Sequence, residues 1–278
     1  MKRLLFISII SLFLASGCTW RSAQSDQKNA AQSHPLTFAV IGDNEGDNAI
    51  FDSLIQGIVG NPDISFILHV GDLTDGGGKQ KVQQMKDRMV SLGVSVPIYA
   101  VPGNHDIKND TNATEFAETF QALPSSVDIE NLHLILLDNA ERKIGFTQDT
   151  LDWLSQDLEA AKGKIIAIAF HRPFGYPLAQ AFGDDETRVS RESNEKFLQL
   201  LYGYDIAHIF TGHIHTYLDF PLIIQGEDGS KKSIPTTVSG GGGQPIQEAL
   251  SSFMNEDYHY LVVTVEDGKI SVMKKGIL

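Results

Sequence analysis

Apolar runs of strand length recur along the chain from residue 36 onward. The runs at 36–41 (LTFAVI) and 64–70 (ISFILHV) are almost continuously apolar, and each is followed directly by Gly-Asp. Runs of this kind are typical of strands that are buried on both faces of a sheet. The same pattern predicts further strands at 94–101, 132–137, 165–170 and 206–210.

Helical periodicity fills the intervals between these runs. It predicts helices at 49–59, 79–92, 114–123 and 148–161. In the last of these, Thr147 is suited to the N-cap, and Leu151, Leu154 and Leu158 share one face. Gly163 is suited to closing this helix. The first half of the chain therefore reads as alternating strands and helices.

The second half has a different texture after position 215. Strand patterns occur at 217–224, 232–238, 258–265 and 269–274. The sequence Glu266-Asp267-Gly268 between the last two predicts a tight hairpin turn. We expect the α/β first half and the β-rich second half to pack as layers of one domain over 36–278.

The N-terminus has the pattern of an export signal. Two basic residues precede an apolar run at 4–14, and small residues follow it, which predicts a signal peptide over 1–17. Leu14-Ala15-Ser16-Gly17-Cys18 resembles a bacterial lipobox, in which the cysteine is lipidated after cleavage. An ordinary signal peptide with an incidental Cys18 is the alternative.

Residues 18–35 are rich in Ser, Gln, Ala and Asn and predict a flexible tether that follows the lipidated Cys18. The expected location is therefore outside the cytoplasm, with the chain lipid-anchored to the cell envelope. Thr19, by resemblance to Gram-negative lipoproteins, favours the outer membrane facing the periplasm if the organism is Gram-negative.

Composition narrows the classes of function. The chain has 278 residues, of which 42% are hydrophobic and 21% charged, which is ordinary for a folded domain. Its formal net charge is −13, and an acidic surface repels nucleic-acid backbones. We therefore expect no nucleic-acid partner. With a single cysteine, the chain forms no internal disulfide.

Polar motifs lie directly after five of the apolar runs. Each alone is most often a turn, but ligands gather beyond the carboxyl ends of strands in α/β sheets. The five together therefore predict one site there. They are Gly42-Asp43-Asn44-Glu45-Gly46, Gly71-Asp72-Leu73-Thr74-Asp75, Gly103-Asn104-His105-Asp106, His171-Arg172-Pro173 and Gly212-His213-Ile214-His215.

This set of motifs resembles that of the calcineurin-like metallophosphoesterases, whose pattern is Asp-x-His, Gly-Asp, Gly-Asn-His-Asp/Glu, a lone His and Gly-His-x-His. The resemblance covers about residues 36–273. It implies a four-layer α/β/β/α sandwich. It also implies metal-dependent phosphoester hydrolysis by a dinuclear site, with a hydroxide that bridges the metals as the nucleophile.

The resemblance also implies a set of metal ligands. Asp72 would bridge two divalent ions, with Asp43 and His215 on the side of the first. The second ion would be held by Asn104, His171 and His213.

One motif position departs from the family, because Glu45 stands where the first motif normally has histidine. A carboxylate there either binds a hard cation or turns away and leaves the first site weak. Oxygen and nitrogen ligands without thiolate suit Mn, Fe or Zn, and a carboxylate in place of histidine favours Mn or Fe over Zn.

Three residues are candidates for contact with the substrate. In the family, the histidine at the position of His105 binds phosphate and protonates the leaving oxygen, and Asn104 lies beside it. Asp106 could hold the His105 imidazole in its charged form, or it could cap a turn. Arg172 could bind a phosphate oxygen or form a surface salt bridge.

The sequence supports further predictions for Asp75, for two loops and for the histidines within strands. Asp75 stands where purple acid phosphatases have an iron-binding tyrosine, so we expect no purple iron centre. The polar stretch 175–194 predicts a long loop at the substrate entrance, and 240–243 predicts a tight turn near the site. For the remaining histidines of the strands, packing is expected rather than ligation; they are His69, His133, His208 and His259.

The substrate stays open between a phosphomonoester and a small phosphodiester. A rival of another class is a binding lipoprotein that keeps the fold but is non-catalytic or binds metal weakly, and Glu45 is the residue that supports it. The retained histidines and Asn104 favour the enzyme.

Overall fold

The structure is a computed structural model, and it describes residues 35–107, 113–173, 187–226, 228–247, 251, 255 and 257–276. Residues 35–278 form one compact unit, and residues 1–34 are a separate one. The signal peptide, Cys18 and the tether lie outside the described residues, so they stay predictions. Among the described residues, no helix is both long and apolar enough to cross a membrane.

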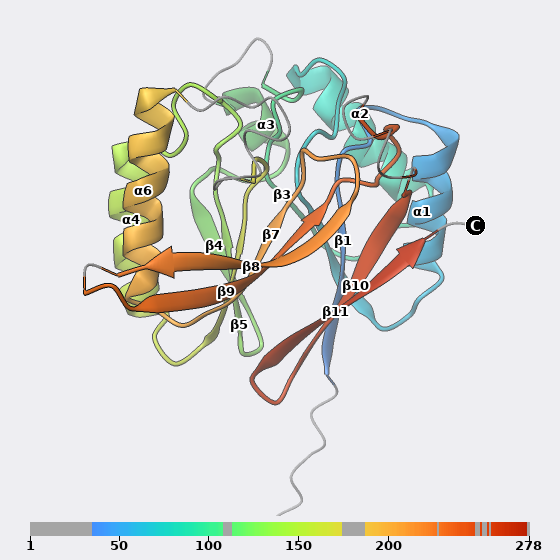
Figure 1. The fold of residues 1–278 in the computed structure, drawn as a ribbon. Helices are drawn as coiled ribbons and strands as arrows, with labels where there is room; N and C mark the ends of the chain where they lie inside the picture. Colours follow the sequence, from blue (N-terminus) through green and yellow to red (C-terminus); the bar gives the residue numbers. More distant parts are fainter. Residues whose placement is uncertain are drawn as a thin grey trace, which may run out of the picture. The chain divides into compact units, whose positions relative to one another are not determined.

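Two β-sheets form the centre of the described unit (Figure 1). The first sheet has the order β11 (Lys269–Gly276), β10 (His259–Glu266), β1 (Leu36–Ile41), β2 (Ile64–His69) and β3 (Ile98–Ala100). The second has the order β4 (Ser125–Ile129), β5 (Leu132–Leu136), β6 (Ile165–Ala169), β7 (Ile206–Thr211), β9 (Lys231–Ser239) and β8 (Tyr217–Gln225). In the first sheet β1, β2 and β3 are parallel, and β10 and β11 add antiparallel pairs at one edge. The second sheet has a parallel centre with an antiparallel pair at each edge.

The continuous apolar run of β1 is explained by burial on both faces. Phe38 and Val40 point into the core between the two sheets, where Phe38 stacks on Phe66 at a centroid distance of 4.4 Å. Ala39 and Ile41 point to the other face, into a second core under helices. Alternate side chains of a strand face opposite sides of the sheet, so both sets must be apolar.

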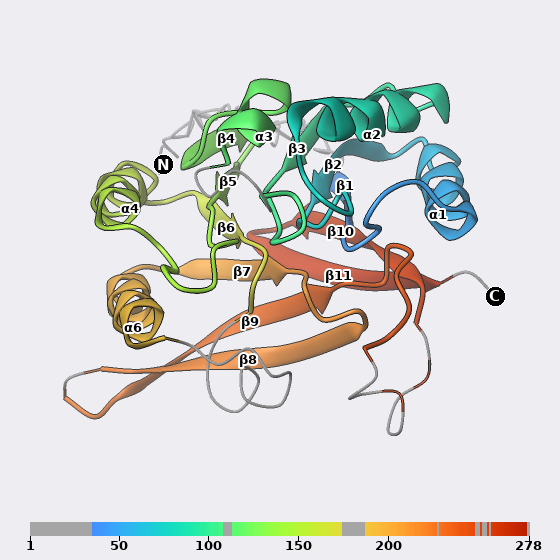
Figure 2. The ribbon, with the colours of Figure 1, turned by 90° about the horizontal axis from the view of Figure 1, so that it is seen from above.

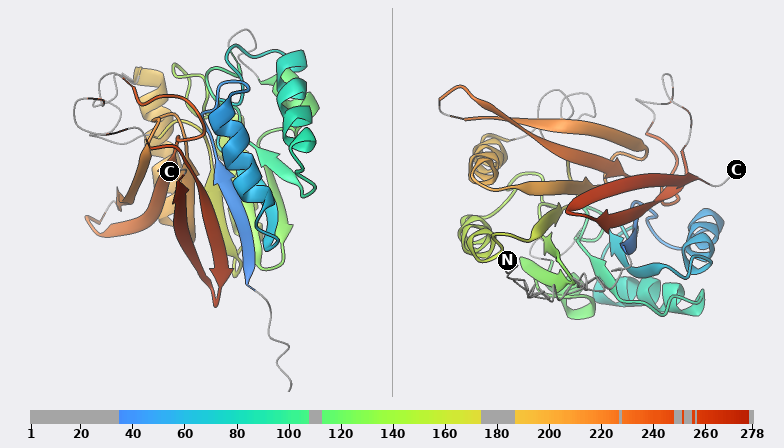
Figure 3. Two further views of the ribbon diagram at one scale, coloured as in Figure 1. Left: turned by 90° about the vertical axis from the view of Figure 1, so that its right-hand side faces the viewer. Right: turned by 90° about the horizontal axis from the view of Figure 1, so that it is seen from below.

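Helices cover the outer face of each sheet. The first sheet packs against α1 (Ala49–Val59), α2 (Lys79–Ser91) and α3 (Thr114–Thr119), and the second against α4 (Gln148–Ala160) and α6 (Arg188–Tyr202). Figure 2 and the view from below in Figure 3 show these two groups on opposite sides of the strands. The expected four-layer α/β/β/α sandwich is confirmed.

Local signals account for several boundaries. The Asn48 side chain caps α1 by accepting from the Phe51 N–H at 2.8 Å, and Thr147 caps α4 by accepting from the Thr150 N–H at 3.1 Å. The predicted hairpin is present, since Glu266 pairs with Lys269 across the turn. Its Asp267 and Gly268 both have positive φ, at 49° and 78°.

The sequence prediction was wrong for one segment and incomplete for another. The stretch 175–194 was expected to be one long loop, but α6 begins at Arg188. Residues 174–186 lie outside the described residues. The edge strand β4 was not predicted, and it pairs antiparallel with β5.

Candidate metal centre

The loops after β1 and β2 lie against each other through backbone hydrogen bonds. The N–H of Asp43 donates to the Gly71 carbonyl and the N–H of Glu45 to the Asp72 carbonyl, both at 2.9 Å. Because β1 and β2 are parallel neighbours, their carboxyl ends meet at one edge of the sheet. The first two motifs are thereby brought together.

Four non-glycine residues of these motifs adopt the left-handed backbone region. The φ values are 64° for Asp43, 45° for Glu45, 52° for Asp72 and 71° for His213. This conformation costs about 1–3 kcal/mol per residue and persists only where the surroundings enforce it. Its concentration here is typical of a functional site.

Glycines in three motifs allow close approach of the site residues. A Cβ on Gly103 would lie 2.1 Å from Asp72 Oδ1, and one on Gly212 would lie 2.5 Å from Asp43 Oδ2. A Cβ on Gly71 would lie 2.4 Å from His171 Nδ1. These glycines are therefore required by packing against the very side chains that the sequence predicts as ligands.

One side of the site contains the buried Asp72 and His171, with Asn104 and His213 half-buried beside them. His171 lies with Nε2 at 3.2 Å from both Asp72 Oδ2 and Asn104 Oδ1, while its Nδ1 is 2.9 Å from the Val70 carbonyl oxygen. A backbone carbonyl that accepts from Nδ1 turns Nε2 towards the acids, which is the usual orientation of a metal-binding histidine. We call Asp72, Asn104, His171 and His213 the buried side.

On the buried side, the Asp72 carboxylate is stabilised by a positively charged neighbour, His171. Burial alone would lower the pKa of His171, but the neighbouring Asp72 carboxylate raises it to about 9. Burial alone would raise the pKa of Asp72, but the His171 imidazolium holds it well below its usual range. A bound metal ion can replace that proton as the partner of the carboxylate.

Asp43 supplies a direct test of whether a metal would fit. Its Oδ1 accepts from the His213 N–H at 2.8 Å, whereas its buried Oδ2 has no hydrogen-bond partner among the described residues. Burial raises the pKa of Asp43 well above its usual range. An orphaned buried carboxylate oxygen is costly unless a proton or a cation neutralises it. The site residues therefore fit a divalent ion.

The other side of the site is more open, and we call Glu45, His105 and His215 the open side. Glu45 Oε1 lies 3.5 Å from His215 Nε2 and 3.6 Å from His105 Nε2. The side chains of Glu45 and His215 are each 15% exposed and that of His105 is 36% exposed. Glu45 thus faces the site rather than turning away from it.

His215 repeats the orientation of His171. Its Nδ1 is 2.8 Å from the Pro245 carbonyl oxygen, so its Nε2 is turned towards Glu45 and towards Asp43 Oδ1, which is 3.9 Å away. Burial lowers the pKa of His215, which favours the neutral form that ligates metals.

Two groups of residues are arranged closely enough to hold a metal ion, and they share Asp72. One consists of Asp72, His171 and His213, and the other of Asp72, Glu45 and His105. Within each group the ligand atoms lie within 4.8 Å of one another. His105, which was predicted to contact the substrate, thus lies next to Glu45 on the open side of the site.

A cavity of about 320 Å³ opens above both sides of the site. Arg172 lies on its wall, where Nε donates to the Ala140 carbonyl at 3.0 Å and Nη1 lies 3.1 Å from His213 Nε2. The exposed Arg142 is a second guanidinium on this wall. The full lining is Glu45, Asp72, Asn104, His105, Arg142, Arg172, His213, His215 and Gln247.

Asp106 makes the contacts of a capping residue. The sequence left two roles open for it, holding the His105 imidazole or capping a turn. Its carboxylate accepts from the backbone N–H groups of Gly103, Leu73 and Thr74 at 2.9, 3.1 and 2.8 Å. Asp106 is buried, and burial raises its pKa to about 6. Its two oxygens fasten the second motif to the third, which is the capping alternative.

Two supporting residues were not predicted as part of the site. The Gln247 side chain accepts from the His215 N–H at 3.0 Å and donates to the His213 carbonyl at 2.7 Å, so it clamps the last motif. Asn44 Oδ1 accepts from Nε2–H of buried His69 at 2.8 Å, which ties the first motif to β2. The glycine turn at 240–243 is near the site as expected, because the Gly242 N–H donates to the Gly42 carbonyl.

Comparisons with known proteins agree with this site. The family model "Calcineurin-like phosphoesterase" matches residues 36–217, and the chain therefore belongs to that family. A "Probable cyclic nucleotide phosphodiesterase" of Colwellia psychrerythraea is 26% identical over 196 residues, which are 65% of this chain and 72% of that protein. The family is one of phosphoesterases, so the chain is a metal-dependent hydrolase.

The chain is also similar to purple acid phosphatases, in sequence to one of them and in fold to another. "Purple acid phosphatase 22" of Arabidopsis thaliana is 23% identical over 279 residues, which are 91% of this chain but less than two thirds, 62%, of the plant protein. The structure of purple acid phosphatase PPD1 from yellow lupin (Lupinus luteus) superposes with a TM-score of 0.62 at 18% identity, over 87% of this chain and 52% of that one.

Proposed function

We propose that this protein hydrolyses phosphoesters with a pair of divalent cations that share Asp72. The observation that carries the proposal is that Asp72 belongs to two clusters of possible metal ligands, one with His171 and His213 and one with Glu45 and His105. In the second cluster we assign Glu45 to the ion and His105 to the substrate. A shared carboxylate brings two cations to about 3.5–4 Å, the spacing that suits an in-line displacement at phosphorus.

The predicted ligands divide between the two ions. Asp72, Asn104, His171 and His213 would hold one ion, while Asp43, Glu45 and His215 with Asp72 would hold the other. When bound, the ions would supply positive charge for the phosphoryl oxygens and lower the pKa of a water towards roughly 7, so that hydroxide is the nucleophile. The ion held by Asp43, Glu45, Asp72 and His215 would have three carboxylates and one histidine, a set that favours Mn or Fe over Zn.

The chain's own residues would complete the chemistry. His105 lies at the open rim of the cavity, where its imidazole can donate a proton to the leaving oxygen. In the reaction a P–O bond forms to the attacking oxygen, the P–O bond to the alcohol breaks, and the alcohol oxygen takes that proton. Arg172, fixed by the Ala140 carbonyl, can bind a non-bridging phosphate oxygen.

We propose a phosphomonoester or a small phosphodiester as the substrate. The names of the relatives, a probable cyclic nucleotide phosphodiesterase and a purple acid phosphatase, cover both chemistries for those proteins. The formal net charge of −13 disfavours long nucleic acids.

The test is turnover by metal-loaded protein. We expect p-nitrophenyl phosphate or bis(p-nitrophenyl) phosphate to be hydrolysed after addition of Mn²⁺, and His213→Ala to lower kcat/KM by about a thousandfold because a ligand of the buried side is lost. His34 belongs to the predicted tether and is not among the predicted ligands, so His34→Ala serves as the matched control.

A different outcome would support the rival function. Absence of turnover with Mn²⁺, Fe²⁺ and Zn²⁺, together with no measurable metal content, would identify a non-catalytic binding protein that retains the fold.

We also propose that Cys18 carries a lipid that holds the chain at the cell envelope. The apolar run 4–14 and the lipobox-like residues before Cys18 support this. Replacement Cys18→Ser is expected to move the protein from the membrane fraction to the soluble fraction of the expressing bacterium. An unchanged distribution would contradict the lipid anchor.

A further inference from the structure

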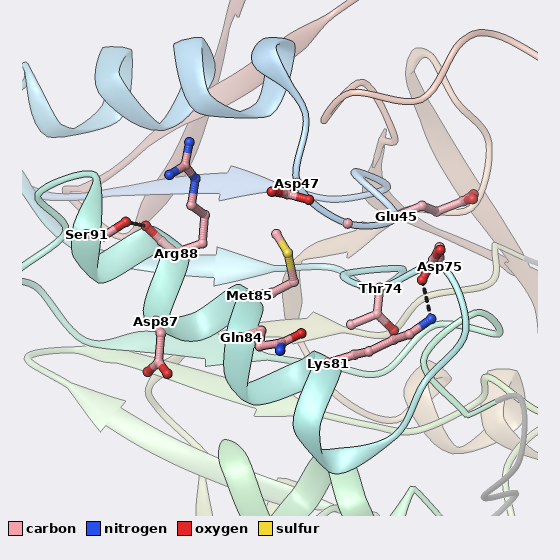
Figure 4. Close-up of a pocket in the computed structure, with 11 residues that line it drawn as sticks. Glu45, Asp47, Thr74, Asp75, Lys81, Gln84, Met85, Asp87, Arg88 and Ser91 are labelled. Atoms are coloured by element: carbon pink, nitrogen blue, oxygen red, sulfur yellow. Dashed lines mark hydrogen bonds and ion pairs between the residues drawn. The ribbon is translucent and has the colours of Figure 1, made fainter.

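A second and larger cavity adjoins the metal centre. Its volume is about 630 Å³, and Glu45 lines both this cavity and the one above the metal centre. Figure 4 shows many of its lining residues on α2, with Glu45 and Asp47 on a loop that faces the helix. We call this space the α2 cavity.

The α2 cavity is long enough for a whole alcohol group. Its lining residues on α2 run from Lys81 to Ser91, which at about 1.5 Å of rise per residue is about 15 Å. The end near Lys81 also includes Thr74 and Asp75, which follow Asp72 in the second motif. A group held at the metals can therefore continue from Glu45 into this space.

The floor and walls have distinct chemistry. Met85 is 5% exposed and provides an apolar floor in the middle of the cavity. The exposed Gln84 lies on α2, and Asp47 lies across from it on the loop (Figure 4). An apolar floor with amide and carboxylate groups around it suits a hydroxylated organic group.

The charges of the α2 cavity disfavour an anionic group. Its two cationic side chains already have carboxylate partners: Lys81 Nζ lies 2.6 Å from Asp75 Oδ1, and Arg88 Nε donates to Asp52 Oδ1 at 3.0 Å. The lining also contains the carboxylates of Glu45, Asp47, Asp75 and Asp87. A second phosphate or a carboxylate placed here would meet like charge.

We propose that the α2 cavity binds the second alcohol of a phosphodiester substrate, and that it selects an alcohol with hydroxyl or ammonium groups over an anionic one. This inference rests on the proposed phosphoesterase function and names the substrate class within it. The phosphate is held at the metal centre, one ester oxygen leaves near His105, and the other alcohol extends past Glu45 along α2.

The test uses p-nitrophenyl phosphodiesters, in which the leaving group is constant and only the second alcohol varies. The four probes carry methyl, glyceryl, choline and carboxyethyl groups. We expect kcat/KM of the Mn²⁺-loaded protein for the glyceryl and choline diesters to exceed that for the methyl diester by about tenfold or more, and the carboxyethyl diester not to exceed it.

Two matched variants locate the effect. Gln84→Trp fills the cavity from an exposed helix position, and is expected to bring the glyceryl and choline diesters down to the level of the methyl diester. Gln80→Trp makes the same change at another exposed glutamine of α2, outside the cavity lining, and is expected to keep the preference.

A third variant tests the role of charge. Asp47→Asn removes one carboxylate of the lining and is expected to narrow the difference between the choline and carboxyethyl diesters.

The outcomes separate this inference from the function on which it rests. Equal rates for all four diesters, or a preference that survives Gln84→Trp, would overturn the α2 subsite while leaving the hydrolase intact. No hydrolysis of any p-nitrophenyl ester at full metal loading would overturn the proposed function itself, and the subsite with it.

Discussion

The buried side of the metal centre is closely bonded, whereas the open side is held by longer contacts. On the buried side, His171 is fully buried and lies 3.2 Å from Asp72 Oδ2 and from Asn104 Oδ1. On the open side, the separations around Glu45 are 3.5 and 3.6 Å, and all three side chains are partly exposed. Both sides depend on the same Asp72 carboxylate.

This difference indicates how a metal site of this family can change one ligand and keep the others. The substitution of the family's histidine by Glu45 falls on the open side, where the side chain has room to adjust. On the buried side the ligands have little room to shift, since a Cβ on Gly71 would lie 2.4 Å from His171 Nδ1 and one on Gly103 would lie 2.1 Å from Asp72 Oδ1. We therefore expect tight binding of one ion and weaker, exchangeable binding of the other.

Asp72→Asn is expected to have the largest effect, because it removes the charge that both sides share. The substitution keeps the shape and can still accept from the His105 N–H, which donates to Asp72 Oδ1 at 2.7 Å. We expect kcat/KM to fall by about a thousandfold or more and both ions to be lost, measured by aryl phosphate turnover and metal analysis. The exposed Asp63→Asn is the control, and comparable loss in that variant would show that folding rather than metal binding is affected.

Glu45→Gln is expected to have a smaller effect, limited to the open side. Loss of one carboxylate should lower the metal content towards one ion per chain and reduce kcat by about 10–100-fold. Glu45→His restores a ligating side chain of the family type, and we expect it to regain the second ion. Unchanged metal content and rate in both variants would show that position 45 is not a working ligand.

The smallest effect concerns the pH dependence of stability. In metal-free protein the pKa of His171 is raised to about 9 from 6.5, so the folded state binds a proton that the unfolded state releases. Its contribution to stability is fully present below pH 6.5 and is lost as the pH rises through 9, with a slope of at most about 1.4 kcal/mol per pH unit.

Urea unfolding between these pH values measures this slope. The chelator-treated protein should lose stability as the pH rises, whereas the Mn²⁺-loaded protein should lack this loss, because the ion takes the place of the proton. A flat or rising stability of the metal-free protein would mean that His171 is not charged against Asp72 in the folded state.

The sequence predicted the strands and loops that carry the site because their signals are local. A buried strand that ends in glycine followed by acid or histidine is visible without any knowledge of the fold, and all five motifs do converge on one edge of the two sheets. The metal-facing direction of Glu45 was left open, because the direction of a side chain depends on neighbours that are distant in the sequence.

The sequence did not predict α6 and β4, because the faces that they bury lack a clear apolar pattern. The covered face of α6 includes Ser190, Ser193 and Asn194, so no apolar stripe marks its first turns. The edge strand β4 is only half-buried over most of its SSVDI sequence, which weakens its pattern. Both elements are recognised only when their packing partners are known.

The supporting contacts of Gln247 and Asp106 are likewise set by tertiary placement. Gln247 follows the glycine turn in a polar stretch, and nothing local indicates that its amide bonds to His213 and His215. Asp106 stands beside His105 in the sequence, but the backbone N–H groups of two loops hold its carboxylate instead.

Calorimetric titration of the metal-free protein with Mn²⁺ measures directly whether two ion sites share Asp72, one with close ligand contacts around His171 and one with longer contacts around Glu45. We predict two ions per chain, of which the first binds more tightly than the second, and loss of only the weaker event in Glu45→Gln. Saturation at one ion per chain, or loss of the tighter event in Glu45→Gln, would contradict this prediction.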